Sequence, residues 1–140
     1  MNERQRVLVR ESWLRCQPVL RQAGAVFYDR LFALDPSVRH LFGSSDMAEQ
    51  QRKLMAMLSR IVAMLDQPED LVAGVTELGR RHGNYGVREF DYESVGEALL
   101  WTLAQGLGEA FTPAVREAWT EAYRVVSGLM RRSGARVATA

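Results

Sequence analysis

Residues 77–87 read Glu-Leu-Gly-Arg-Arg-His-Gly-Asn-Tyr-Gly-Val, and the rest of the chain is organised around the histidine in this stretch, His82. Leu71, Val75, Leu78 and His82 lie at i, i+4, i+7 and i+11, which is the spacing of one helical face. His82 therefore ends an apolar face of a predicted helix. An inward imidazole can ligate a metal through one ring nitrogen while the other bonds a backbone carbonyl. It can also be a core histidine with both nitrogens satisfied. Other parts of the chain must decide between these two interpretations.

Size and composition indicate one globular domain. The chain has 140 residues, 47% of them hydrophobic, which is enough to bury a core. Its 18 basic and 17 acidic residues leave a net charge of +1, so we expect no nucleic-acid partner. It has a single cysteine, Cys16, no signal-peptide pattern and no apolar run near the roughly 18 residues that a membrane span needs. We therefore expect a soluble cytoplasmic protein with no membrane contact.

Apolar residues recur at helical spacing along the chain, and no segment alternates with the period of a strand. The fold is therefore expected to be all-α, with about six long helices and one short one. A globular domain should cover residues 1–134 and a frayed tail 135–140. Spacing alone leaves two arrangements open, an up-down bundle and an orthogonal packing. The expected helices cover residues 3–17, 21–34, 36–42, 47–65, 68 to near Gly83 or Gly86, 92–107 and 113–132, the last closed by Ser133-Gly134.

Two helix starts have the residues of known capping motifs. Asp46, followed three residues later by Glu49, has the form of a capping box. Asp91 is expected to cap the fifth long helix, with Phe90 packed onto Val95 as a hydrophobic staple. The apolar face of the third long helix is expected to consist of Gln50, Leu54, Met57 and Ile61, with Leu58 and Leu65 beside them.

Two polar side chains are expected to face inward. Tyr28 shares a helical line with Gly24 and Leu31, and a glycine one turn before it permits another helix to cross closely. A buried tyrosine hydroxyl needs a hydrogen-bond partner. The amide of Gln50, at the head of an apolar line, offers donors to whatever that line covers. The plainer alternatives are a core tyrosine bonded to some carbonyl and a frayed helix end.

Taken together, these residues resemble the globin family, and within it a bacterial relative of neuroglobin. Pro36, with Phe42 six residues later and His82 in the expected later helix, is a fairly specific globin pattern. The matching segments, in chain order, are Glu11-Ser12-Trp13, Arg30-Leu31-Phe32-Ala33-Leu34-Asp35-Pro36, Leu41-Phe42, Arg52-Lys53-Leu54-Met55, Leu78-Gly79-Arg80-Arg81-His82, Val95-Gly96-Glu97-Ala98-Leu99-Leu100 and Ala110-Phe111-Thr112-Pro113-Ala114, with Trp119 and Tyr123 beyond.

The resemblance implies the globin fold, with helices packed orthogonally around haem b. His82 would be the proximal ligand of the iron, and Phe42 would pack on the porphyrin. Lys53 matches a position that can reach a haem propionate, although a solvated surface lysine is an equal alternative. The other positions that the resemblance places in the haem pocket are Leu54, Leu58, Leu78, Val87, Tyr92 and Val95.

On the distal side, Tyr28, Gln50 and Leu54 resemble the set found in bacterial flavohaemoglobins. Neuroglobin has a second histidine where this chain has Gln50. Glutamine is a poor iron ligand, so the sixth iron position should be open to gas or water. Iron-bound dioxygen carries partial negative charge, and a hydrogen bond to a charged group is worth about 1.5–3 kcal/mol. Two such bonds would slow oxygen loss by roughly two to four powers of ten.

The resemblance thus implies a protein that binds dioxygen, and possible further ligands are nitric oxide and carbon monoxide. One hypothesis is oxygen binding or transport with high affinity. The other is nitric oxide detoxification by a dioxygenase that converts nitric oxide and bound oxygen to nitrate. Flavohaemoglobins have a proximal tyrosine, matched by Tyr92, and a glutamate whose counterpart here falls at Gly134. Because the globin accounts for the 140 residues, such an enzyme would need a separate reductase. A haem-free helical regulator is a third hypothesis, which the inward phenol and amide argue against.

Overall fold

The computed structural model describes residues 1–43, 46–84 and 91–139, with side chains described except at 82–84 and 133–139. In these ranges every regular element is helical, which confirms the all-α prediction. The elements are α1 (Glu3–Cys16), η1 (Gln17–Val19), α2 (Leu20–Leu34), η2 (Pro36–Leu41), α3 (Met47–Met64), α4 (Pro68–Asn84), α5 (Asp91–Leu107), η3 (Gly108–Ala110) and α6 (Pro113–Thr139). Among the described residues, no helix is both long and apolar enough to cross a membrane.

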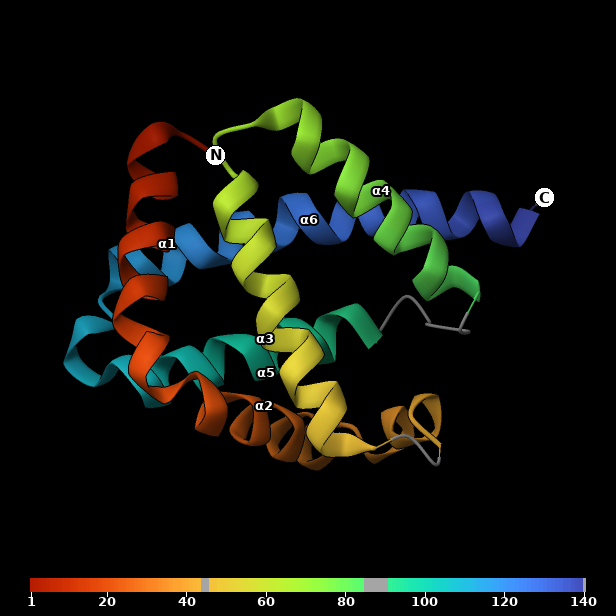
Figure 1. Ribbon diagram of the computed structural model, residues 1–140, viewed down its shortest axis with the longest axis horizontal. Coiled ribbons are helices and arrows are strands. Elements are labelled where there is room, and N and C mark those ends of the chain that lie inside the picture. Colours follow the sequence, from red (N-terminus) through yellow and green to blue (C-terminus); the bar gives the residue numbers. More distant parts are fainter. Residues whose placement is uncertain (44–45, 85–90, 140) are drawn as a thin grey trace.

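The helices cross one another at steep angles. In Figure 1, α1 and α3 run across α2, α5 and α6, and α4 lies obliquely over α6. The main contacts join α4 with α6, α2 with α5, α1 with α6 and α2 with α3. This arrangement is the orthogonal packing, and it excludes the up-down bundle that the spacing alone had left open.

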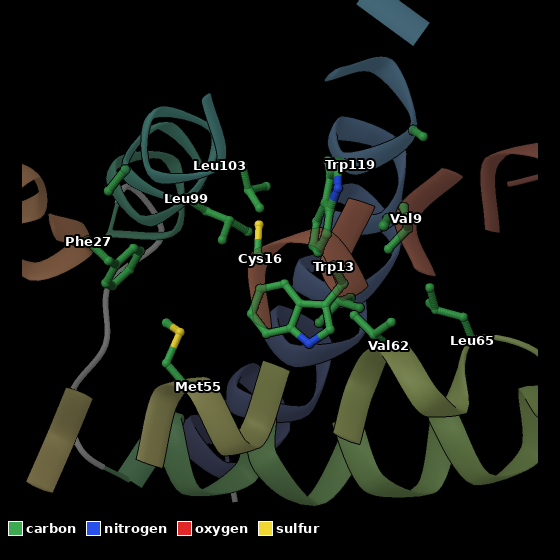
Figure 2. Packing of buried hydrophobic residues seen from close by; sticks show 14 of the residues in the cluster. Val9, Trp13, Cys16, Phe27, Met55, Val62, Leu65, Leu99, Leu103 and Trp119 are labelled. Carbon is green, nitrogen blue, oxygen red and sulfur yellow. The ribbon is translucent and has the colours of Figure 1, made fainter. Parts of the chain in front are cut away.

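Two tryptophans tie α1 to its neighbours at the centre of the core. Trp13 and Trp119 are 5% and 3% exposed, and their ring centroids lie 5.8 Å apart. Trp119 Nε1 donates to the buried hydroxyl of Ser12 at 2.8 Å, and Trp13 Nε1 donates to Ser59 at 3.1 Å. Figure 2 shows Trp13 between the side chains of α3 and Trp119. The core therefore satisfies its indole donors by hydroxyl groups from other helices.

The buried face of α3 differs in part from the predicted one. Its buried residues are Met55 and Val62, and Figure 2 shows Val62 beside the ring of Trp13. The prediction is confirmed in part, because Leu65 is buried and Leu54, Leu58 and Ile61 pack against the core. It missed the neighbouring line of Met55 and Val62, which helical periodicity does not distinguish from the predicted one. The predicted residues Gln50, Leu54, Met57 and Ile61 are only half-buried.

The hydrogen bonds at the start of α3 confirm part of the capping predictions. Asp46 caps α3, accepting from the backbone N–H groups of Ala48 and Glu49. The predicted capping box is wrong, because the Glu49 carboxylate accepts a hydrogen bond from Arg52 Nε at 3.1 Å and not from the backbone N–H of Asp46. The structure has a complete capping box elsewhere, between Asn2 and Gln5 at the start of α1.

Two other helix limits also differ from the sequence-based ones. α5 begins at Asp91 itself, so this buried residue is the first of the helix rather than the cap before it, and Phe90 lies outside the described residues. α6 runs to Thr139 instead of ending at Ser133-Gly134. A single glycine costs a helix only about 1 kcal/mol, and no proline follows it. The frayed tail at 135–140 stays a prediction.

Candidate functional site

A close crossing of α2 and α3 forms the frame of the distal side. Gly24 is buried where the two helices meet, and a Cβ at this position would lie 2.9 Å from Gln51 Cβ and 3.3 Å from the Gln51 carbonyl oxygen. The prediction that Gly24 permits a close helix crossing is therefore confirmed. Tyr28 lies one turn further along α2, and Gln50 precedes Gln51 on α3. The crossing thus brings the part of α2 that carries Tyr28 to the first turns of α3.

Tyr28 points inward, as predicted, and only 6% of it is exposed. Its ring packs edge-to-face on Phe27 and Phe42, with centroid distances of 5.1 and 5.3 Å, and lies 6.0 Å from the ring of Phe32. Within the described part of the chain, its hydroxyl has no hydrogen-bond partner. Burial raises the pKa of Tyr28 to about 12. The phenol therefore keeps its proton at neutral pH and can donate it to a further acceptor.

Phe42 is brought to Tyr28 by the short helix η2. Asp35 begins this helix by accepting from the Ser37 N–H at 3.2 Å, and Pro36 occupies its first position. The Ser94 hydroxyl of α5 donates to the other oxygen of Asp35 at 3.4 Å. Gly43, with φ of +47°, follows Phe42 in the left-handed region that favours glycine. The half-buried Phe42 therefore follows a short helix whose start is held by the hydrogen bonds of Asp35.

The predicted α3 residues form a half-buried band. Gln50, Leu54 and Leu58 are each partly exposed, whereas Lys53 is exposed. Across the described residues, no hydrogen-bond partner is found for the Gln50 side chain. The exposure of Lys53 agrees with a solvated lysine and leaves its proposed contact with a propionate untested. Tyr28 on α2 and Gln50 on α3 thus offer two hydrogen-bond donors, each close to the point where the two helices cross.

Helix α4 carries the predicted metal ligand. Leu71 and Val75 are buried and Leu78 is half-buried, so the apolar face that leads to His82 packs inward as expected. The backbone of His82 lies in the last turn of α4. Its side chain, and all of Val87, lie outside the described residues, so their place at the site stays a prediction.

The first turn of α5 is fastened to α6 by a contact that the sequence did not suggest. Tyr92 is buried and Val95 half-buried. The Tyr123 hydroxyl donates to the Tyr92 carbonyl oxygen, and burial raises the pKa of Tyr123 strongly. The Arg131 guanidinium lies 5.1 Å from the centre of the Tyr92 ring. Spacing could not identify these partners, because each contact joins two helices that are distant in sequence.

The structure therefore brings Tyr28 and Phe42 together directly, and it places Gln50 and Leu54 on the helix that crosses beside Tyr28. Tyr92 and Val95 share the first turns of α5. Contacts between these two groups and His82 depend on side chains outside the described residues.

Comparisons with known proteins agree with this arrangement. The family model described as Globin matches residues 25–130. Neuroglobin of Danio rerio is 32% identical over 149 residues, which covers 97% of this chain and 94% of that protein. Neuroglobin of Tetraodon nigroviridis is 31% identical with the same coverage.

Solved structures show the same fold. An engineered carbene transferase made from a proposed nitric oxide dioxygenase of Rhodothermus marinus is 29% identical, with a TM-score of 0.88 over 99% of this chain and 96% of that one. A hexacoordinated haem protein from an anhydrobiotic tardigrade has a TM-score of 0.84 over 95% of this chain and 94% of that one, at 18% identity. The family match and the similarity to neuroglobins, which extends over nearly the whole chain, show that this protein belongs to the globin family.

Proposed function

We propose that this globin binds haem b through His82 and holds dioxygen tightly at an open sixth position, with Tyr28 and Gln50 as hydrogen-bond donors. Bound haem supplies a ferrous iron that binds diatomic gases and leaves partial negative charge on dioxygen. Phe42 would pack on the porphyrin, and Lys53 could pair with a propionate. The remaining lining residues would be Leu54, Leu58, Leu78, Val87, Tyr92 and Val95.

The observation that carries this proposal is the inward Tyr28 phenol, which is only 6% exposed and whose hydroxyl has no hydrogen-bond partner among the described residues. Such a phenol is available as a donor to an acceptor that enters the space beside it. The surrounding rings of Phe27, Phe32 and Phe42 offer none. A gas with partial negative charge is such an acceptor. With its pKa raised to about 12, the phenol stays a donor throughout the neutral range.

Gln50 is the second support for the proposal. An amide can donate a hydrogen bond to a gas but is a poor ligand of haem iron, so the sixth position stays available. The neuroglobins, which share up to 32% of the aligned residues, are expected from the family resemblance to have a histidine there. This chain would therefore bind gas without first displacing one of its own side chains.

The test begins with absorption spectra of the purified protein in its ferric, ferrous and oxygen-bound forms. We expect a broad five-coordinate ferrous band and a stable oxygen complex. In stopped-flow measurements, Tyr28→Phe should release oxygen about 10- to 100-fold faster, as expected for the loss of one hydrogen bond to a charged acceptor. Thr120→Val, which removes an exposed hydroxyl on α6, is the control and should match the wild type. Failure to take up haem, or an unchanged rate in Tyr28→Phe, would overturn the proposal.

Gln50→His tests the open position separately. The new imidazole should ligate the ferrous iron and convert the broad band into sharp six-coordinate bands. Carbon monoxide would then bind more slowly, because the imidazole must first dissociate. A wild-type protein that already shows six-coordinate ferrous bands contradicts an open sixth position.

A second candidate function is nitric oxide dioxygenation, favoured by the similarity to the Rhodothermus protein. In that reaction nitric oxide, dioxygen and one electron give nitrate; the haem held by His82 would supply the redox iron, and a separate reductase would supply the electron. Nitrate formed per haem, measured with and without an added chemical reductant, separates the two functions. Repeated turnover with the reductant favours the enzyme, whereas a slow or single turnover favours the oxygen-binding protein.

A further inference from the structure

We propose that Gly24 is a positioning residue for the gas, because the missing side chain at the α2–α3 crossing sets how closely Tyr28 can approach its acceptor. This inference rests on the proposed function of the same site. It concerns a residue that would touch neither haem nor gas, and it follows from the contact between Gly24 and Gln51.

The crossing has no room for even one methyl group. A Cβ on Gly24 would lie 2.9 Å from Gln51 Cβ and 3.3 Å from the Gln51 carbonyl oxygen. Carbon atoms pack best at about 3.5–4.0 Å, so α2 and α3 would have to separate by roughly half an ångström or more. Neither contact atom is the end of a flexible side chain that could turn away. The backbone itself would have to move.

Such a movement would reach the two donors directly. Tyr28 lies one turn after Gly24 on α2, and Gln50 is the neighbour of Gln51 on α3. Hydroxyl donors make good hydrogen bonds only over a narrow range of about 2.5–3.0 Å. A shift of half an ångström between the helices would therefore weaken the bond from Tyr28 without removing the phenol. The fold should survive, because alanine also favours the helical state over glycine.

The experiment compares oxygen dissociation from the holoprotein of Gly24→Ala and of Gly128→Ala, the matched control. At Gly128, a Cβ would meet only the end of the Arg132 side chain, at 3.5 Å. We expect Gly24→Ala to release oxygen about three- to ten-fold faster, which corresponds to at most about 1.4 kcal/mol, and Gly128→Ala to match the wild type. The infrared stretch of bound carbon monoxide should move in Gly24→Ala in the same direction as in Tyr28→Phe.

Two further variants show whether the effect passes through the crossing and through Tyr28. Gln51→Gly added to Gly24→Ala removes the closest contact and should restore most of the wild-type rate, leaving the carbonyl contact at 3.3 Å. In a Tyr28→Phe background, Gly24→Ala should add little, because residues that act through one interaction are not additive. Additive effects, or no recovery with Gln51→Gly, overturn the inference.

The outcomes also separate this inference from the function on which it rests. If Tyr28→Phe leaves oxygen release unchanged, the proposed function fails. If Tyr28→Phe has its expected effect while Gly24→Ala behaves like the wild type, only the role of Gly24 is wrong. Should Gly24→Ala fail to take up haem, the double variant is compared with Gln51→Gly alone. A double variant that takes up haem and releases oxygen only slightly faster than Gln51→Gly supports the inference, and a double variant that still takes up no haem contradicts it.

Discussion

The ring of Tyr28 lies among the aromatic rings of Phe27, Phe32 and Phe42. Edge-to-face ring pairs such as Tyr28 with Phe27 and Phe42 contribute about 0.5–1.5 kcal/mol each beyond their buried area. They hold the phenol in one orientation before any ligand arrives. A donor fixed in this way loses little conformational entropy when it binds a gas, so more of the hydrogen-bond energy appears as slower release.

The raised pKa of Tyr28 predicts a loss of stability at high pH. Between the ordinary tyrosine pKa near 10 and the folded value of about 12, the folded state holds a proton that the unfolded state has lost. The free energy of unfolding should therefore be insensitive to Tyr28 below pH 10 and fall by up to about 2 kcal/mol as the pH rises toward 12. Urea unfolding at pH 9 and pH 11 measures this change.

Tyr28→Phe is the reference for that measurement, because phenylalanine has no proton to lose. Its free energy of unfolding should fall less between the two pH values than that of the wild type. Tyr123 has a pKa raised in the same direction and remains in both proteins, so its contribution cancels in the difference. Equal losses in the wild type and in Tyr28→Phe would contradict the prediction.

At the scale of helices, two glycines of α5 should respond in opposite ways to alanine. A Cβ on Gly96 would lie 2.8 Å from Tyr123 Cε2, and that ring is held in place by its hydroxyl bond to Tyr92. Gly96→Ala should therefore cost about 1–3 kcal/mol through overpacking. At Gly106 the nearest atoms lie at 3.8 Å, so Gly106→Ala should be neutral or stabilise by up to about 1 kcal/mol. Thermal unfolding of both variants tests this, and destabilisation of equal size would refute it.

Two serines that accept from tryptophans provide a second test of helix packing. Ser12→Ala leaves Trp119 Nε1 buried without its acceptor and should lower the free energy of unfolding by about 1–3 kcal/mol. Ser59 accepts from Trp13 but is half-buried, so water can replace it and Ser59→Ala should cost less than about 1 kcal/mol. Urea denaturation gives both values. A larger loss for Ser59→Ala would mean that the α1–α3 contact, rather than the α1–α6 contact, stabilises this core.

Helical periodicity predicted the elements well because an apolar face on a helix is a local property. It predicted the inward Tyr28 and the glycine crossing at Gly24, and the structure confirms both. It did not predict that Met55 and Val62 are the most buried residues of α3, nor the bond between Tyr123 and Tyr92. Those depend on where another helix crosses, and the residue spacing within one helix holds no information about that.

At the scale of the whole molecule, the proposed site joins elements that touch one another little. α4, which carries His82, packs chiefly on α6 and only lightly on α3, whereas Tyr28 and Gln50 belong to the α2–α3 pair. Haem bound between His82 and the distal residues would add contacts between these two parts of the fold. The stability of the molecule should therefore depend on haem more strongly than the packing among its helices alone would suggest.

The two histidines of the chain allow this dependence to be measured. Haem at 100 times its dissociation constant stabilises a folded protein by about 2.7 kcal/mol, which for a domain of this size raises the unfolding temperature by roughly 10 °C. We expect haem to produce this rise in the wild type and in His40→Ala, since His40 is exposed on η2, and not in His82→Ala. The haem-free forms of the wild type and His82→Ala should unfold at similar temperatures, because alanine is the better helix former. Haem stabilisation that persists in His82→Ala would mean that another residue holds the iron, and the assignment of His82 as the proximal ligand would be wrong.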